Sequence, residues 1–402
     1  MSNIPQELIF DILSRLESKD LIRYTCVSKA WYALIHNQDF IKAHLQLSIK
    51  TNSTRNILFH NRRTNYTLDF LSLPFDNDEM LGTATKLGSP MPSKYSWDIV
   101  GYANGLVCLR NYMEGGIALW NPSIQKLKKI PEPYAQLPPP ELDYGFGYDS
   151  TNDDYKLVQI VELANEEDIV VSHQVRVYSL KANSWKRIQD IPSSGYYVFS
   201  VGFCDIVFLN GALGWLMCGE LLDPQCKIVT LDLASEKYRV FPIPVDNIED
   251  RYMPDLKILG DYLCICLNFR SRRDVWIMKE FGETESWSLL YSIDRQPNVC
   301  VKPLAFSKNG EMVLLEMLGN EYSRLSWYDL EKKSVKQVEI SGLLPLRYYL
   351  TTVCWGSLCL LDGDPVIAKS SNKRKTSSSK KRKTSSSKMR KISSIVKPFK
   401  LW

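Results

Sequence analysis

The sequence predicts a mainly β chain in which a small helical module precedes a β-propeller and a basic tail follows it. Helical apolar spacing is confined to the first 45 residues, turn signals then recur about every fifty residues, and the end of the chain is rich in Lys, Arg and Ser. We therefore expect a helical module over 1–45, a propeller over 46–368 and a disordered basic tail over 369–402.

The first forty residues predict three short helices. Apolar side chains of the first helix recur at spacings of one, three and four residues, with Pro5 in the first turn: Leu8, Ile9, Ile12, Leu13 and Leu16. A second helix is expected after a capping Ser18 and a third from Ser28. Because so short a module is marginal alone, we expect it to share core side chains with the rest of the chain or with a partner.

Residues 4–40, IPQELIFDILSRLESKDLIRYTCVSKAWYALIHNQDF, resemble the F-box, the helical motif that docks on the adaptor Skp1 within cullin-RING ubiquitin ligases. Glu17 stands where a proline is usual and Tyr24 where phenylalanine is commoner. An ordinary helical hairpin that caps the next domain is the alternative. The resemblance implies that nine residues contact the adaptor or form the core behind that contact: Ile4, Pro5, Leu8, Ile12, Leu13, Leu16, Leu21, Val27 and Trp31.

The body of the chain is a repeat of about fifty residues. Turn signals lie between apolar runs at Asn104-Gly105, Thr151-Asn152, Asn210-Gly211, Gly260-Asp261, Asn309-Gly310 and Trp355-Gly356. A second strand-turn-strand phrase lies between these turns, as in ALWNPSIQKLKKIP and LSWYDLEKKSVKQV. Two hairpins per repeat make a four-stranded unit that must stack on its copies, which predicts a β-propeller of the kelch size class.

The two ends of the repeat region predict how the propeller closes. Five full units follow Asp98, and a sixth begins at 351–363 without its outer hairpin. Residues 57–70 offer the missing hairpin, so we expect six blades closed by strands from both ends of the region. The recurring tryptophans are expected between blades, and aromatic or Arg side chains near the channel are the expected anchors for a bound partner.

The repeat region resembles the F-box-associated region of plant F-box and kelch-repeat proteins, including the S-locus type. The phrases that carry the resemblance are GYANGLVCL, IALWNPSIQKLKKIP, YGFGYDSTNDDYKLVQI, VYSLKANSWKRI and FLNGALGWL. It implies a non-catalytic substrate-recognition subunit of an SCF (Skp1-cullin-F-box) ubiquitin ligase, with a Skp1-like adaptor, a cullin reached through it, and an unidentified protein substrate on the propeller. A propeller scaffold or a nucleic-acid-associated nuclear protein acting outside a ligase is the alternative.

The residue types needed for catalysis do not gather in the sequence. The four histidines and ten cysteines form no metal-binding spacing, and neither a nucleophile elbow nor a phosphate loop occurs. We expect no catalytic residue, metal or cofactor; a propeller enzyme, the rival class, would need a metal or carboxylate cluster. Scattered cysteines without a Cys-x-x-Cys pair predict reduced thiols, with Cys264 and Cys266 in the core, in a nuclear or cytoplasmic protein that spans no membrane.

The tail repeats the octapeptide KRKTSSSK, and its basic clusters are Lys373, Arg374, Lys375, Lys380, Lys381, Arg382 and Lys383. Of the 50 Lys and Arg, 37 lie in residues 1–364 with all 45 acids, which gives that body a net charge of −8 and disfavours a nucleic-acid-binding face. For the tail itself, nuclear import through an import receptor, binding to nucleic acid or anionic lipid, control by phosphorylation, and simple solvation all stay open.

Overall fold

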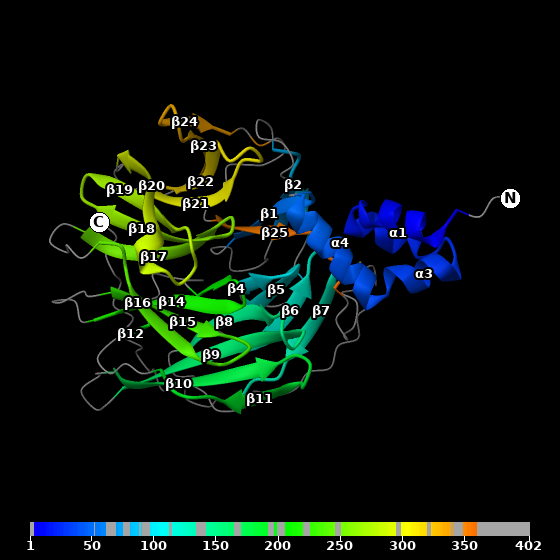
Figure 1. The fold of residues 1–402 in the computed structure, drawn as a ribbon, viewed down its shortest axis with the longest axis horizontal. Helices are drawn as coiled ribbons and strands as arrows, with labels where there is room; N and C mark the ends of the chain where they lie inside the picture. The colour runs from blue at the N-terminus through cyan, green and yellow to red at the C-terminus, as the bar shows by residue number, and fades with distance from the viewer. Residues whose placement is uncertain are drawn as a thin grey trace, which may run out of the picture. The chain divides into compact units, whose positions relative to one another are not determined.

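A computed structural model shows a helical module followed by six antiparallel sheets (Figure 1). The description covers residues 4–51, 53–61, 70–74, 81–87, 90, 97–111, 115–133, 142–164, 170–191, 197–198, 206–219, 226–245, 251–294, 299–319, 323–338, 340 and 349–359. Helices and blades belong to one compact unit, Met1–Val366. Within the described residues, no helix is both long and apolar enough to cross a membrane.

The module has four helices where the sequence predicted three: α1 (Gln6–Ser14), α2 (Ser18–Tyr24), α3 (Lys29–Ile35) and α4 (Gln38–Lys50). Ser28 caps α3 as expected, because its side chain accepts a hydrogen bond from the Trp31 amide at 3.1 Å. The capping role predicted for Ser18 is wrong, since Ser18 is the first residue inside α2 and Glu17 precedes it without a side-chain cap. Asn37 starts the unexpected α4 by accepting from two backbone amides.

Blades 1 to 5 are formed in chain order. In blades 1, 2, 4 and 5 the first strand is innermost, and in blade 3 both β12 and β13 pair with β14. Blade 1 contains β4 (Asp98–Ala103), β5 (Leu106–Arg110), β6 (Ile117–Asn121) and β7 (Lys126–Ile130). Blade 2 contains β8 (Leu142–Asp149), β9 (Asp154–Ala164), β10 (Val170–Ser179) and β11 (Ser184–Arg187). Blade 3 contains β12 (Tyr197–Val198), β13 (Val207–Leu209), β14 (Ala212–Cys218), β15 (Cys226–Asp232) and β16 (Tyr238–Pro242).

Blade 4 contains β17 (Arg251–Leu259), β18 (Tyr262–Phe269), β19 (Arg272–Met278) and β20 (Trp287–Asp294), with a 3-10 turn η1 (Thr284–Ser286) before β20. Blade 5 contains β21 (Cys300–Phe306), β22 (Met312–Leu318), β23 (Ser323–Asp329) and β24 (Ser334–Gln337). The closing blade contains β25 (Tyr349–Trp355), β1 (Arg55–Asn61), β2 (Phe70–Pro74) and β3 (Thr85–Lys86). The predicted six-bladed propeller is thus confirmed.

The closing blade joins both ends of the repeat region, as expected, but divides its strands differently. The sequence predicted two inner strands from 351–363 and an outer hairpin from 57–70. In the structure β25 alone comes from the C-terminal side, and β1 pairs with it from Arg55 opposite Trp355 to Asn61 opposite Tyr349. Because β1 already occupies that edge of β25, residues 356–359 do not form a strand.

Apolar side chains pack between neighbouring blades and form the core. Trp120 and Trp215 are fully buried, and Cys264 and Cys266 lie in the interior of β18 as expected. At the turn after β4, Asn104 and Gly105 both have positive φ (48° and 83°), as a two-residue hairpin turn requires.

The expectation of reduced thiols is wrong for one pair of cysteines. Cys218 and Cys226 lie opposite each other on β14 and β15, and the structure joins them in a disulfide. Seven residues lie between them in the sequence, so the pair forms no short Cys motif.

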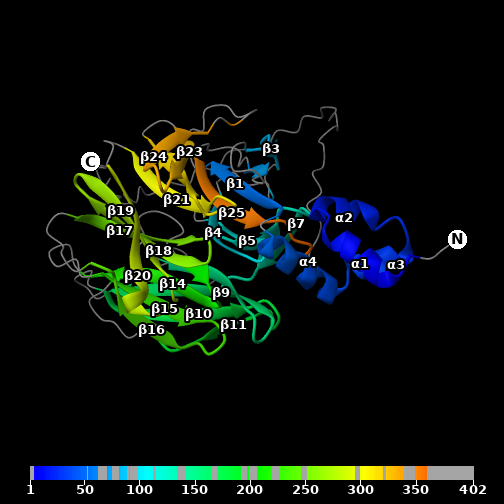
Figure 2. The same cartoon turned by 45° about the horizontal axis from the view of Figure 1, so that its top comes forward.

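The propeller has two faces, at opposite ends of its strands. The helix face carries the turns that follow the inner strands, such as Asn104-Gly105 and Gly260-Asp261, and the end of β25, which α4 contacts (Figures 1 and 2). The far face carries the opposite strand ends, including the turn between β18 and β19.

Candidate functional site

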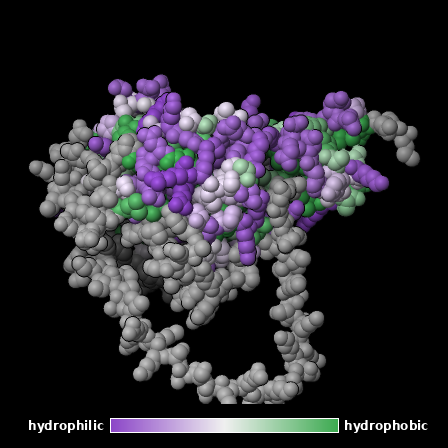
Figure 3. Space-filling model, turned by 90° about the horizontal axis from the view of Figure 1, so that it is seen from below, coloured by the Kyte–Doolittle hydropathy of each residue, from purple (hydrophilic) through white to green (hydrophobic). Residues whose placement is uncertain are grey.

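The helical module exposes large apolar side chains that soluble domains usually bury. Ile4, Leu8, Ile12 and Val27 are each more than half exposed, at 59%, 54%, 53% and 58%. Leu8 and Ile12 are four residues apart on α1, so the helix presents both along one side, and Ile4 lies just before the N-cap residue Pro5. Hydrophobic surface is visible among hydrophilic side chains on the module, at the right of Figure 3. Such a set marks a surface that a partner covers.

The other predicted docking residues lie around or behind this surface. Pro5 is exposed and Leu16 and Trp31 are half-buried, whereas Leu13 and Leu21 are 1% and 0% exposed and form core. The prediction covered both cases, since it assigned these residues either to contact with the adaptor or to the core behind that contact. Tyr32 on α3 is 53% exposed and was not among the predicted docking residues.

The core of the helical module is completed by the propeller. Leu13, Leu21 and Phe40 pack together with Leu358, which follows β25, and with Ile124 from the β6–β7 turn. Leu358 is 1% exposed. The predicted sharing of core is therefore confirmed, and the neighbour that supplies the side chains is the propeller of the same chain, through Leu358 and Ile124.

Residues 356–359, which we call the strap, are held against blade 1. The Asn121 amide donates to the carbonyl oxygens of Ser357 and Cys359 at 3.2 and 2.9 Å, and the Ser357 amide donates to the Ser123 hydroxyl. A Cβ added to Gly105 would lie 1.9 Å from the Ser357 Cβ, so only glycine lets the β4–β5 turn approach the strap this closely.

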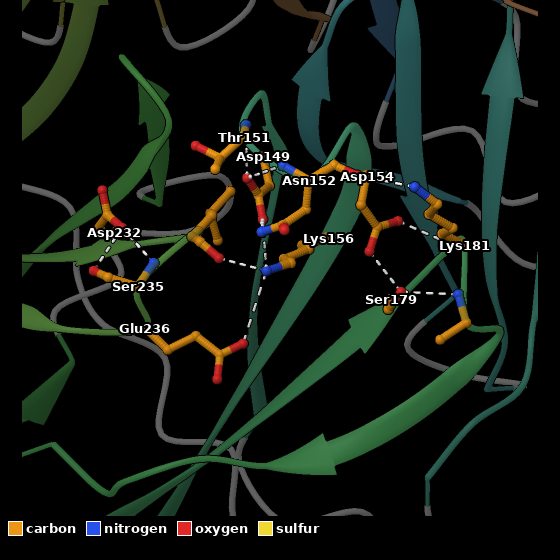
Figure 4. Close-up of polar contacts among 12 residues, drawn as sticks. Asp149, Thr151, Asn152, Asp154, Lys156, Ser179, Lys181, Asp232, Ser235 and Glu236 are labelled. Carbon is orange, nitrogen blue, oxygen red and sulfur yellow. Dashed lines mark hydrogen bonds and ion pairs between the residues drawn. The ribbon is translucent and has the colours of Figure 1, made fainter.

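The hairpin between β8 and β9, residues 149–156, links blade 2 to blade 3 through a buried lysine (Figure 4). Lys156 forms an ion pair with Asp149 at 2.8 Å, lies 3.8 Å from Glu236 and donates to the Leu233 carbonyl. Burial raises the pKa of Asp149, but hydrogen bonds from Lys156 and Asn152 outweigh it and leave the pKa below its ordinary value. The specific GYDSTNDDYK phrase is thus a structural clamp between blades.

The same hairpin also contacts the helices. Lys42 on α4 forms an ion pair with Asp153 at 2.7 Å, and its hydrogen bond lowers the pKa of that carboxyl group. Both side chains are about half exposed, so this pair adds at most about 1 kcal/mol, and its main effect is on orientation.

Ionisable side chains gather on blades 4 and 5. Asp255 and Lys257 lie on β17, Arg273 on β19, Lys302 on β21 and Glu316 on β22; we call these five the inner charge cluster. Lys257 is 2.7 Å and Lys302 is 3.9 Å from the Asp255 carboxylate. Asp255, Lys257 and Lys302 lie on the first strands of their blades. Glu316 lies on the second strand of blade 5 and Arg273 on the third strand of blade 4.

The pKa values of two carboxyl groups in this cluster are shifted in opposite directions. Burial raises the pKa of Asp255, but Lys257 and Lys302 outweigh it and the pKa lies below its ordinary value. For Glu316, burial dominates and raises the pKa to about 7. Asp255 is therefore a fixed negative charge, whereas Glu316 is only partly ionised at neutral pH.

Nothing in the described part of the chain has the arrangement of a metal centre: no group there of three or more His, Cys, Asp or Glu side chains could hold an ion. The tail residues predicted as an import signal, 373–375 and 380–383, lie outside the described residues.

Comparison with known proteins identifies both halves of the chain. Residues 1–43 match the family described as F-box domain, and residues 56–349 match the F-box associated beta propeller domain. The F-box protein CPR1 of Arabidopsis thaliana is 32% identical over 85% of this chain and 85% of its own length. The F-box/kelch-repeat protein At3g23880 of the same plant is 30% identical over 87% of this chain and 95% of its own length.

Among solved structures, TolB from Acinetobacter baumannii aligns with 79% of this chain and 72% of its own, at 12% identity and a TM-score of 0.46. The sequence matches, by contrast, cover both the helical module and the propeller. The chain therefore belongs to the plant F-box proteins that carry an F-box-associated β-propeller.

Proposed function

We propose that this protein is the substrate-recognition subunit of an SCF ubiquitin ligase. In this role the helical module docks a Skp1-like adaptor, the adaptor links it to a cullin, and the propeller binds a protein substrate. The observation that carries the proposal is the set Ile4, Leu8, Ile12 and Val27, which is exposed although the rest of the module has a complete core. F-box membership supports the same role.

The protein acts in this proposal without catalytic residues of its own. Tethering a substrate close to the ubiquitin carrier of the ligase raises the effective concentration of its acceptor lysines. The strap and the Lys42–Asp153 pair support this role, because they hold the helices against the propeller and so restrict where the substrate is presented.

Co-purification with Skp1 tests the docking step. Full-length protein is expected to retain Skp1, and Leu8→Asp and Ile12→Asp are expected to abolish retention, because each places a charge in a surface that must desolvate. Ile49→Asp, at a 39% exposed apolar position on α4, is the matched control and should leave retention unchanged. If wild-type protein fails to retain Skp1 while another F-box protein succeeds, the proposal is wrong.

The tail suggests nuclear entry, as a separate proposal within the same function. Its two KRK clusters, 373–375 and 381–383, have the composition of import signals. A fluorescent fusion of the full chain should enter the nucleus, and Gln at all six positions should shift it to the cytoplasm. Equal distribution of the two proteins would refute an import role for the tail.

A further inference from the structure

A histidine, His44, is buried at the centre of the helical module. It lies on the inner side of α4 and is 0% exposed. Its Nε2 atom lies 2.8 Å from the carbonyl oxygen of Leu16, 28 residues away in the sequence. Leu16 follows the last residue of α1 by two positions. The hydrogen bond therefore ties the middle of α4 to the end of α1.

The partner of Nε2 fixes the protonation state of the His44 ring. A carbonyl oxygen only accepts, so Nε2 carries a hydrogen and donates it to Leu16. Nδ1 is buried and has no hydrogen-bond partner among the described residues, so a proton on it would be unpaired. Burial lowers the pKa of His44 below its ordinary value of 6.5, and the hydrogen bond to Leu16 opposes this only in part. His44 is therefore a neutral donor at neutral pH.

The turn between α1 and α2 depends on contacts from outside it. Carbonyl groups at the end of a helix lack partners within the helix, and Glu17, which precedes α2, provides no side-chain cap. His44 satisfies the Leu16 carbonyl from one side. On the other side Ser18 is 3% exposed and faces Gly356 of the strap, where an added Cβ would lie 3.3 Å from the Ser18 Oγ. The turn is thus held between α4 and the strap.

Helix α4 contacts α1 at a second place. The Phe40 ring on α4 packs edge-on against the Phe10 ring on α1, with ring centroids 5.1 Å apart. Phe10 lies in the middle of α1 and Leu16 just beyond its end, so the two contacts together fix the direction of the helix axis. Leu8 and Ile12 are exposed on the same helix. The direction of α1 therefore determines where these docking residues point.

Helix α4 is in turn attached to the propeller, because it contacts β25 and Lys42 pairs with Asp153 at 2.7 Å. We propose that His44 is a positioning residue for adaptor docking, which holds the end of α1 on α4 and thereby fixes Leu8 and Ile12 relative to the propeller. This inference rests on the proposed function, since it assigns a role in adaptor docking to a residue outside the docking surface. Without the His44 contact, α1 would have to be ordered when the adaptor binds, and that cost weakens binding.

Titration calorimetry of the full-length protein with Skp1 tests the proposal. His44→Leu removes the donor, and His44→Asn keeps an amide that is too short to reach Leu16, so both should bind Skp1 about fivefold to tenfold more weakly. His44→Gln, whose longer amide can donate to the same carbonyl, should bind within about twofold of wild type. Ser48→Ala is the matched control, because it removes another buried polar group from α4, one turn further along, and should leave the affinity unchanged.

Hydrogen exchange without Skp1 separates positioning from overall stability. In His44→Leu the amides of residues 16–20 should exchange at least about tenfold faster than in wild type, while the midpoint of urea unfolding stays the same. The proposal is overturned if a folded His44→Leu or His44→Asn binds Skp1 as wild type does, or if His44→Gln binds as weakly as His44→Leu. It is also overturned if neither His44→Leu nor His44→Asn folds, or if Skp1 affinity follows the unfolding midpoint across the variants, because the contact then serves stability alone. Failure of the wild-type protein to bind Skp1 is a different result, which refutes the proposed function itself.

Discussion

Replacing Glu316 by glutamine should change how the stability of the propeller depends on pH. The folded pKa of about 7 lies above the ordinary value of 4.5 because the carboxyl group is fully buried. The folded state therefore binds the Glu316 proton more tightly than the unfolded state does. The stability that protonated Glu316 contributes to the folded state is fully present below pH 4.5 and is lost as the pH rises through about 7.

The size of the effect follows from the difference between the two pKa values. A difference of about 2.5 units corresponds to about 3 kcal/mol of unfolding free energy, and most of this change falls between pH 5 and pH 8. Glutamine keeps the shape and cannot ionise. We therefore expect Glu316→Gln to gain about 2–3 kcal/mol relative to wild type as the pH is raised across that interval.

Urea unfolding of both proteins at pH 5, 6, 7 and 8 measures the difference directly. Glu331→Gln, at an exposed position on the β23–β24 turn, controls for the loss of a carboxylate elsewhere in blade 5. A difference between Glu316→Gln and wild type that stays constant from pH 5 to pH 8 would refute the reasoning. So would a difference of opposite slope, which would mean that Lys302 stabilises the ionised form more than burial opposes it.

Three further substitutions test other contacts. Leu358→Ala should lower the unfolding free energy by about 2–5 kcal/mol and speed proteolysis of the helical module, and Leu289→Ala, at a 49% exposed position, should stay within about 0.5 kcal/mol. Lys156→Met should cost about 3–5 kcal/mol in urea, because it leaves the Asp149 carboxylate buried without its cation. Thiol titration of the unfolded wild-type chain should find two more reactive thiols after reduction than before. In Cys218→Ser, which lacks the disulfide, reduction should add none.

Much of the fold could be predicted from the sequence because its signals are local. Asn104-Gly105 needs two positive φ angles, and a tight hairpin provides them. Because such turns repeat along the chain, they predict a four-stranded unit, and the stacking of these units predicts the propeller. The division of the closing blade could not be predicted in this way, because β1 and β25 pair although they lie at opposite ends of the repeat region.

The candidate sites were predictable to different degrees. The docking residues repeat at helical spacing, so Leu8 and Ile12 stand out in the sequence, although their exposure does not. The inner charge cluster has no sequence signature, since Asp255, Arg273 and Lys302 come from different strands and meet only when blades 4 and 5 pack together. The disulfide was missed for the same reason, because strand register alone places Cys218 opposite Cys226.

The strap joins the proposed adaptor-docking surface to the propeller. The helices contact the end of β25, and Leu358 of the strap packs into the core of the helical module. Tethering accelerates ubiquitin transfer only when the bound segment is held in a limited range of positions relative to the ligase. A loosened strap would leave the exposed docking residues and the propeller loops intact and would widen that range. Leu358→Ala is therefore expected to reduce ubiquitination of a bound substrate more than it reduces binding of Skp1 or of that substrate.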